Sequence, residues 1–195
     1  MKYAAPILAT LLAANAMAAT ASSTAKVSTK GGKPYFEATE TTTAHALVLS
    51  INQSNRHVKL KTDAGDTVKV VAPAEVTNLA QIKKGDMVNI TYTEKLSIHV
   101  EAGGAAGTSA EVTSSTAKPG AKPSASASAK AQVKATITAI DKTKGTAMLK
   151  GPEGNEFEVT PLHPENLDKV KVGDVVVFTY SQAVAASVEK ALASK

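Results

Sequence analysis

The sequence predicts an all-β protein built from two copies of one small, five-stranded, OB-like barrel, joined by a flexible linker. The first observation behind this prediction is a repeat: NLAQIKKGDMVNITYT at residues 78–93 returns 88 residues later as NLDKVKVGDVVVFTYS. The match extends upstream at an offset of 89, over roughly 55 residues with one single-residue gap, which indicates internal duplication. The second observation is the alternation of apolar and polar residues in both copies, which is typical of strands with one buried face.

Each copy begins with a strand whose alternate positions are small or apolar. The positions expected to face the core are Ala46, Val48 and Ser50 in the first copy and Ala135, Ile137 and Ala139 in the second. On the opposite face, the first copy has Leu47 and Leu49 where the second has Thr136 and Thr138. A lone module of this size buries only about 60% of the surface that its unfolded chain exposes. We therefore expect Leu47 and Leu49 either at a contact between the modules or as scattered surface residues.

The next two strands of each copy form a predicted hairpin. They span 56–62 and 66–72 in the first copy, and 146–150 and 155–160 in the second. The connections end in Gly65 and Gly154, and a glycine at this position can adopt the left-handed conformation that closes a type I hairpin loop. Each copy should therefore open with a three-stranded meander.

A short helical turn follows the meander. Asn78 and Asn166 are the predicted N-caps, because an asparagine oxygen accepts hydrogen bonds from the free N–H groups of a first helical turn. The Gly-Asp pairs at 85–86 and 173–174 should end the turn and begin the fourth strand. Their aspartates are interpreted as turn residues that hydrogen-bond to nearby backbone.

The last two strands of each copy come from a second run of alternation. The inner residues of the fourth strand are Val88, Ile90 and Tyr92 in one copy and Val176, Phe178 and Tyr180 in the other. Breaks at 94–95 and 182–183 should lead to a fifth strand, with inner residues Leu96, Ile98 and Val100, and Val184, Ala186 and Val188. Three strands, a helical turn and two strands is the order found in an OB-type barrel.

The chain should divide into six segments. They are a signal peptide at 1–18, a flexible tail at 19–34, module one at 35–101, a linker at 102–131, module two at 132–190 and a tail at 191–195. The linker consists largely of Ala, Ser, Gly, Pro and Lys, and such a stretch buries too little apolar surface to offset its ordering entropy.

The first residues indicate export. Lys2 precedes an apolar run from Ala4 to Ala14, and small residues suited to cleavage follow near 16–19. The sequence has no Cys, so it has neither the acylated residue of a bacterial lipoprotein nor a disulfide. We expect a soluble periplasmic protein without a membrane anchor. The formal net charge of +5 is too small to predict a polyanionic partner.

Two histidines are the candidate metal ligands. If the first and fifth strands of module one pair, His45 and His99 could meet and form a two-histidine site of the kind that copper or zinc accepts. The alternative is that both are solvated strand residues, and on that interpretation the chain has no metal site and no cofactor.

Other kinds of site lack the residues they need. The only acid that recurs within clear motifs is the aspartate of Gly-Asp, so no catalytic residue is predicted and the protein is not expected to be an enzyme. Nucleic-acid binding would require exposed aromatic side chains for stacking. The aromatic residues assigned to the core are Tyr92, Tyr180, Phe157 and Phe178. In the mature chain only Tyr35 and Phe36 remain, and we expect no nucleic-acid partner.

The motif Lys-x-Gly-Asp-x-Val-x-x-Thr-Tyr, approximated at 84–92 and 171–180, resembles that of uncharacterised exported proteins of Gram-negative bacteria with paired small β-barrels. The resemblance covers residues 35–190 and implies no activity or functional residue. We expect a non-catalytic binding or assembly component of the cell envelope, with another envelope protein as its partner. The alternatives are a periplasmic metal-binding or chaperone-like protein, and an OB-type binder of oligonucleotides or glycans.

Overall fold

The computed structural model describes residues 19–72, 76, 78–118 and 120–190. The expected signal peptide at 1–18 and the tail at 191–195 lie outside these residues. The protein is all-β, as the alternation predicts. The strands are β1 (Ala19–Lys30), β2 (Lys33–Asn52), β3 (His57–Thr62), β4 (Thr67–Val71), β5 (Asp86–Glu101), β6 (Gly107–Thr116), β7 (Ser124–Asp141), β8 (Thr146–Lys150), β9 (Glu156–Val159) and β10 (Val175–Lys190).

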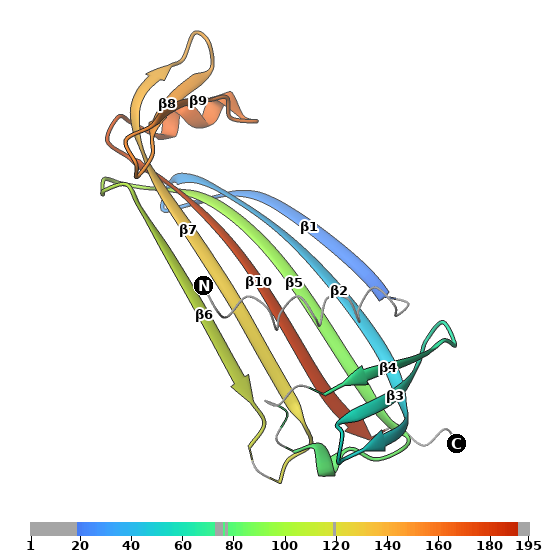
Figure 1. Cartoon of the computed structure of the whole chain (residues 1–195). Coiled ribbons are helices and arrows are strands. Elements are labelled where there is room, and N and C mark those ends of the chain that lie inside the picture. The colour runs from blue at the N-terminus through green and yellow to red at the C-terminus, as the bar shows by residue number, and fades with distance from the viewer. Residues whose placement is uncertain (1–18, 73–75, 77, 119, 191–195) are drawn as a thin grey trace.

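All ten strands belong to one antiparallel sheet (Figure 1). The order is β4-β3-β2-β5-β10-β7-β8-β9, with β1 paired to β2 and β6 paired to β7. The long strands lie side by side, while the β3–β4 and β8–β9 hairpins lie at opposite ends of them (Figure 1). Two short 3₁₀ helices, η1 (Leu79–Gln81) and η2 (Pro164–Lys169), precede β5 and β10.

The expectation of two closed five-stranded barrels is wrong. The predicted fourth and fifth strands of each copy are one uninterrupted strand, β5 or β10, of 16 residues each. No break occurs at 94–95 or 182–183, because β5 and β10 pair with each other along their whole length. Each strand therefore continues across the molecule instead of turning back to close its own module.

The segments expected to be flexible are also strands. Residues 19–34 contain β1 and the start of β2, and residues 102–131 contain β6 and the first part of β7. Their Ser, Thr and Ala side chains bury little, but the β1–β2 and β6–β7 ladders satisfy their backbone groups. Lys33-Pro34 and Lys122-Pro123 are 89 residues apart, and the first pair begins β2 while the second directly precedes β7. The duplication thus spans a first copy at 19–101 and a second at 107–190.

A pseudo-twofold axis relates the two copies. In the β5–β10 ladder, Glu94 lies opposite Gln182. These two residues are also repeat counterparts, 88 positions apart. Equivalent residues of the two copies meet only where a twofold axis passes, so the axis lies between Glu94 and Gln182 at the centre of the sheet.

The long strands divide their side chains between two faces. Residues directly opposite each other in an antiparallel pair share a face. One face, here called the apolar face, includes the pairs Val27–Phe36, Phe36–Ile98, Ala44–Ile90, Val184–Tyr92, Phe178–Val133 and Ala129–Val112. The polar face is rich in Thr, Ser, Lys and Glu, including Thr39–Lys95 and Glu111–Lys130.

A cap lies on the apolar face at each end of the sheet. The first cap consists of β3, β4 and η1, and its buried core is Ala44, Ala46, Val48, Val58, Leu60, Leu79, Ile82 and Val188. The second cap consists of β8, β9 and η2, and covers Ala135, Ile137 and Leu149, with Val176 and Phe178 packed against them. Val188 comes from the second copy, so the core at the first cap includes residues of both copies.

The hairpins form as predicted, whereas one inward position of each copy and both predicted N-caps differ. Both hairpins form, and Gly65 and Gly154 have positive φ angles of 91° and 84°. Ser50 and Ala139, expected to face the core, are exposed, because a bulge in β2 and its counterpart in β7 reverse the alternation there. Asn78 makes no capping bond, because its amide donates to the Lys118 carbonyl at 2.7 Å. The N-cap of η2 is His163, not Asn166.

Candidate ligand-binding site

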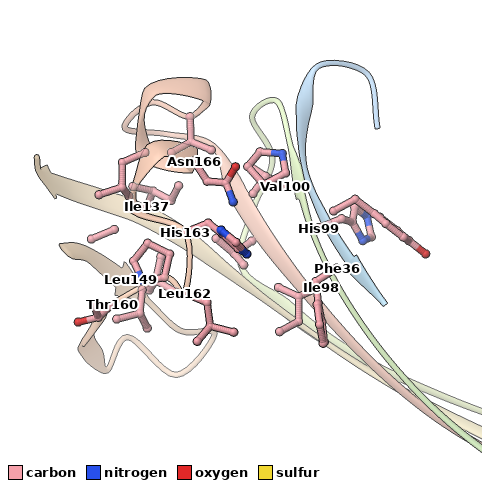
Figure 2. Close-up of a pocket in the computed structure, with 18 of the residues that line it drawn as sticks. Phe36, Ile98, His99, Val100, Ile137, Leu149, Thr160, Leu162, His163 and Asn166 are labelled. Atoms are coloured by element: carbon pink, nitrogen blue, oxygen red, sulfur yellow. The ribbon is translucent and has the colours of Figure 1, made fainter. Parts of the chain in front are cut away.

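A cavity of about 360 Å³ lies beneath the second cap (Figure 2). The tip of the β1–β2 hairpin and the end of β5 form one side of this cavity, and β8, β9 and η2 form the other. It therefore lies where the two copies meet. Its volume falls within the range of roughly 300–1,000 Å³ that is common for small-molecule sites.

Hydrocarbon side chains make most of the lining. On the sheet side these are Val27, Pro34, Phe36, Ile98, Val100, Ile137, Val176 and Phe178, and on the cap side Ala147, Leu149, Val159, Pro161, Leu162, Leu167 and Val170. Leu149, Leu162 and His163 face Phe36 and Ile98 across the cavity (Figure 2). Leu162 is 90% exposed, an unusual state for a leucine beside an apolar cavity.

A few polar groups reach the lining, chiefly Thr160, His163 and Asn166 from the connection between β9 and η2 and from η2. His163 Nδ1 lies 3.1 Å from Glu165 Oε1. Since a carboxylate only accepts hydrogen bonds, Nδ1 is the donor of this bond. The Asn166 side-chain oxygen accepts a bond of 3.1 Å from Lys169. An apolar lining with few polar groups binds ligands through burial of hydrocarbon and orients them with the polar groups.

The first cap differs from the second in the residues at the position equivalent to the cavity. Tyr35 and Phe36, which line the cavity, correspond at an offset of 89 to Ser124 and Ala125. Leu60, Leu79 and Ile82 are each at most 5% exposed in the first core. Of the two aromatic residues that the sequence left without a core position, Phe36 is thus directed into the cavity, whereas Tyr35 lies on the other face of β2, where its hydroxyl donates to Glu37. This difference between the copies is visible in the sequence and could have indicated that only one copy has a binding site. The position of the cavity depends on the packing of one copy against the other.

The Gly-Asp aspartates form ion pairs in addition to the predicted hydrogen bonds within their turns. Asp86 and Asp174 each accept a hydrogen bond from the backbone N–H three residues earlier, at 2.8 and 2.9 Å, as predicted. Each also forms an ion pair with a lysine of the other copy: Asp86 with Lys122, and Asp174 with Lys33. These lysines are repeat counterparts, so the two ion pairs are related by the pseudo-twofold axis. They join each long hairpin to the opposite copy.

Burial and hydrogen bonding act against each other on these two carboxyls. The Asp86 and Asp174 residues are 4% and 0% exposed. Burial raises the pKa of each carboxyl, but the lysine and the backbone N–H favour the charged form and hold each pKa below its usual value. Both aspartates are therefore ionised at neutral pH.

The structure does not bring His45 and His99 together. Strands β2 and β5 do pair, but His45 lies opposite Asn89 and His99 opposite Tyr35. Tyr35 and His45 are ten residues apart on β2, so the two histidines are separated by about 33 Å along the strands. His45 donates to Asn89 Oδ1 at 2.8 Å, and the His99 ring lies 6.2 Å from that of Tyr35. Within the described segments, no three His, Asp or Glu side chains converge as a metal site requires.

Leu47 and Leu49, the residues expected either at the contact between the modules or on the surface, are half-buried. Leu47 pairs with Met87 and Lys61, and Leu49 is at the bulge of β2. The copies meet through β5 and β10. Two aromatic residues assigned to the core are partly exposed, with Phe157 at 38% and Tyr180 at 43%.

Comparisons with protein-family models, with curated proteins and with solved structures find no match. In the part of the chain that the structure describes, no helix has the length and apolar character needed to cross a bilayer.

Proposed function

We propose that this protein is a non-catalytic binding protein of the cell envelope that holds an apolar or amphiphilic small molecule beneath the second cap. The observation that carries the proposal is the 360 Å³ cavity, lined by hydrocarbon side chains from both copies. Exposed Leu162 at its edge supports it, because an apolar side chain in that position gains free energy when a ligand covers it.

The envelope location is part of the same proposal. It is supported by the leader-like first residues, in which Lys2 precedes an apolar run and small residues suited to cleavage. The sequence led us to expect another envelope protein as the partner. A small apolar ligand is favoured over a protein partner here, because the cavity is enclosed on two sides by different elements. A nucleic-acid ligand is disfavoured, because the exposed Tyr180 donates its hydroxyl to a carboxylate, Glu94, which repels phosphate.

Binding of a homologous series of linear alcohols tests the proposal. Each methylene transferred into an apolar site contributes about 0.8 kcal/mol, so Kd should fall by about fourfold per carbon until the cavity is full. Displacement of a fluorescent apolar probe from the purified protein measures this series. Affinity that does not change with chain length would contradict the proposal.

A cavity-filling substitution locates the site. Ile98 is directed into the cavity from β5 (Figure 2), so Ile98→Trp should weaken probe binding by about tenfold or more without unfolding the sheet. Ser97→Trp is the matched control, because Ser97 is on the polar face of the same strand. Equal loss in both variants, or loss in neither, would place binding elsewhere.

A further inference from the structure

The apolar face continues from the cavity towards the centre of the sheet. Along β5 it passes from Ile98, in the cavity lining, to Leu96 and then to Glu94. Leu96 is 38% exposed, and on neighbouring strands Val133 and Tyr180 are 41% and 43% exposed. Large apolar side chains that remain accessible beside a cavity indicate a surface that a ligand or partner covers.

A polar cluster interrupts this face at the pseudo-twofold axis. Glu94 Oε1 accepts hydrogen bonds from the Tyr92 hydroxyl at 2.6 Å, the Tyr180 hydroxyl at 2.7 Å and the Gln182 amide at 3.0 Å. Tyr92 and Tyr180 are repeat counterparts, so their hydroxyls approach Glu94 from opposite directions along the strands. The β2–β5 register also places Glu40 directly opposite Glu94.

The carboxylates of Glu40 and Glu94 differ from those of Glu37 and Glu101 in their ion pairing. Glu37 on the polar face pairs with Lys95 at 2.7 Å, and Glu101 pairs with Lys134 at 2.8 Å. Among the described residues, neither Glu40 nor Glu94 makes such an ion pair. Like charges directly opposite on adjacent strands destabilise a sheet, so this pair has a cost that a bound cation would remove. The second copy has Ala129 and Gln182 at the equivalent positions, which confines the negative charge to one side of the axis.

We propose that the apolar face between Glu94 and the cavity binds a single-chain amphiphile with an ammonium head group. This rests on the proposed function and names the ligand class of the same site. The ammonium group lies between Glu40 and Glu94, and the alkyl chain passes over Leu96 to Ile98 and into the cavity. Glu94 and Ile98 are four residues apart on β5, about 13 Å, a distance that an extended alkyl chain spans. The tyrosine rings beside Glu94 are also favourable neighbours for an ammonium group.

Calorimetric titration of the purified protein with dodecyltrimethylammonium, dodecyl sulfate and dodecanol tests this assignment, with the two ionic ligands kept below their micellar concentrations and dodecanol below its solubility limit. The cationic ligand should bind about tenfold more tightly than the anionic one, since ion pairing and cation–π contact add to the same chain burial. Equal affinity for the two charged ligands, or a preference for the anion, would overturn it.

Substitution of the two carboxylates assigns the charge preference to residues. The double variant Glu40→Gln, Glu94→Gln should lose the preference for the cation while its affinity for dodecanol stays within about twofold, since Gln keeps the hydrogen-bond acceptor for both tyrosines. Glu37→Gln removes a carboxylate from the polar face of β2 and should leave the preference intact. A preference that survives the double variant would contradict the assignment.

The experiment separates the two proposals. Dodecanol binding that is sensitive to Ile98→Trp, without any charge preference, would sustain the proposed function and overturn this inference. Absence of binding by all three ligands would overturn both. A second copy of the chain is the competing occupant of the apolar face, and sedimentation equilibrium tests for it. A dimer that binds none of the three ligands and that Leu96→Lys dissociates would show that a second copy covers this face and would overturn the inference.

Discussion

At the scale of single residues, the two buried ion pairs have the largest predicted effect on stability. Lys33 and Lys122 reach across the pseudo-twofold axis to Asp174 and Asp86. The Asp174 carboxylate is the harder of the two to bury, because its Oδ1 is buried and has no hydrogen-bond partner among the described residues. The lysine is thus the main compensation for a carboxylate removed from water.

Replacing Lys33 should therefore destabilise the protein strongly. Lys33→Met leaves Asp174 charged and buried, and loss of one partner of a buried pair costs about 3–5 kcal/mol. Lys95→Met is the control, because the Lys95–Glu37 pair has side chains that are 43% and 27% exposed and its loss costs at most about 1 kcal/mol. Urea unfolding measures both, and equal costs would contradict the role given to Lys33.

The same carboxyls make stability depend on pH. Their pKa values in the folded protein are below the usual value, so their contribution is present above an unfolded-state pKa of about 4 and is lost as pH falls through the lower folded values. Unfolding free energy should be flat from pH 7 to 5 and decrease below about pH 4. The double variant Asp86→Asn, Asp174→Asn should be less stable at pH 7 and show a shallower acid decrease. An unchanged acid decrease would assign it to other groups.

At the scale of elements, the two long central strands differ from the two outer ones. Both β5 and β10 have a hydrogen-bonded neighbour on each side, whereas β1 and β6 are each paired on one side only. The outer strands are also mostly exposed. Strands that bury little and pair on one side open locally at low free energy.

Hydrogen exchange should rank these strands. Amides in β5 and β10 are expected to exchange last and those of β1 and β6 first, because only local opening is needed to free the outer strands. Exchange followed by mass spectrometry on peptides of each strand measures the order. Protection in β1 or β6 equal to that in β5 would show that another element or a partner covers these edges.

At the scale of the whole molecule, the pseudo-twofold axis predicts that a fragment containing one copy forms a dimer. In this dimer, the second fragment would take the place of the missing copy. A fragment of residues 19–101 keeps β1 to β5 but loses β10, which supplies Val188 to the first core. A second fragment can replace β10 with its own β5, because the two strands are equivalent. Lys33 of one fragment would then pair with Asp86 of the other.

Symmetry makes this dimer sensitive to one side chain. Glu94 would lie opposite Glu94 of the second fragment, whereas in the whole chain it lies opposite Gln182. Two opposed carboxylates repel, so Glu94→Gln should strengthen the fragment dimer by about fivefold or more in Kd. Sedimentation equilibrium of the fragment and its variant measures this. A fragment that folds cooperatively as a monomer would contradict the shared-core arrangement.

Local features of the chain were predictable because their causes are local. The alternation of apolar and polar residues shows which side chains share a face, and Gly65 and Gly154 adopt the positive φ angles that their hairpin loops need. Asp86 and Asp174 accept the predicted backbone bonds for the same reason. Phe36, an aromatic residue without a predicted core position, lies at the cavity, although nothing near it in the sequence indicates what it faces.

The sequence by itself thus determined the all-β class, the duplication, the hairpins and the division into two faces. Only the tertiary structure decided that β5 and β10 run through the molecule, that β6 and the first part of β7 lie in the stretch expected to be a linker, and that a cavity forms between the copies. The physical reason is that the partner and register of a strand depend on hydrogen bonds to distant residues, which a local pattern does not specify. The β5–β10 register, which places Glu94 opposite Gln182, also places Lys33 beside Asp174 and Phe36 beside the second cap.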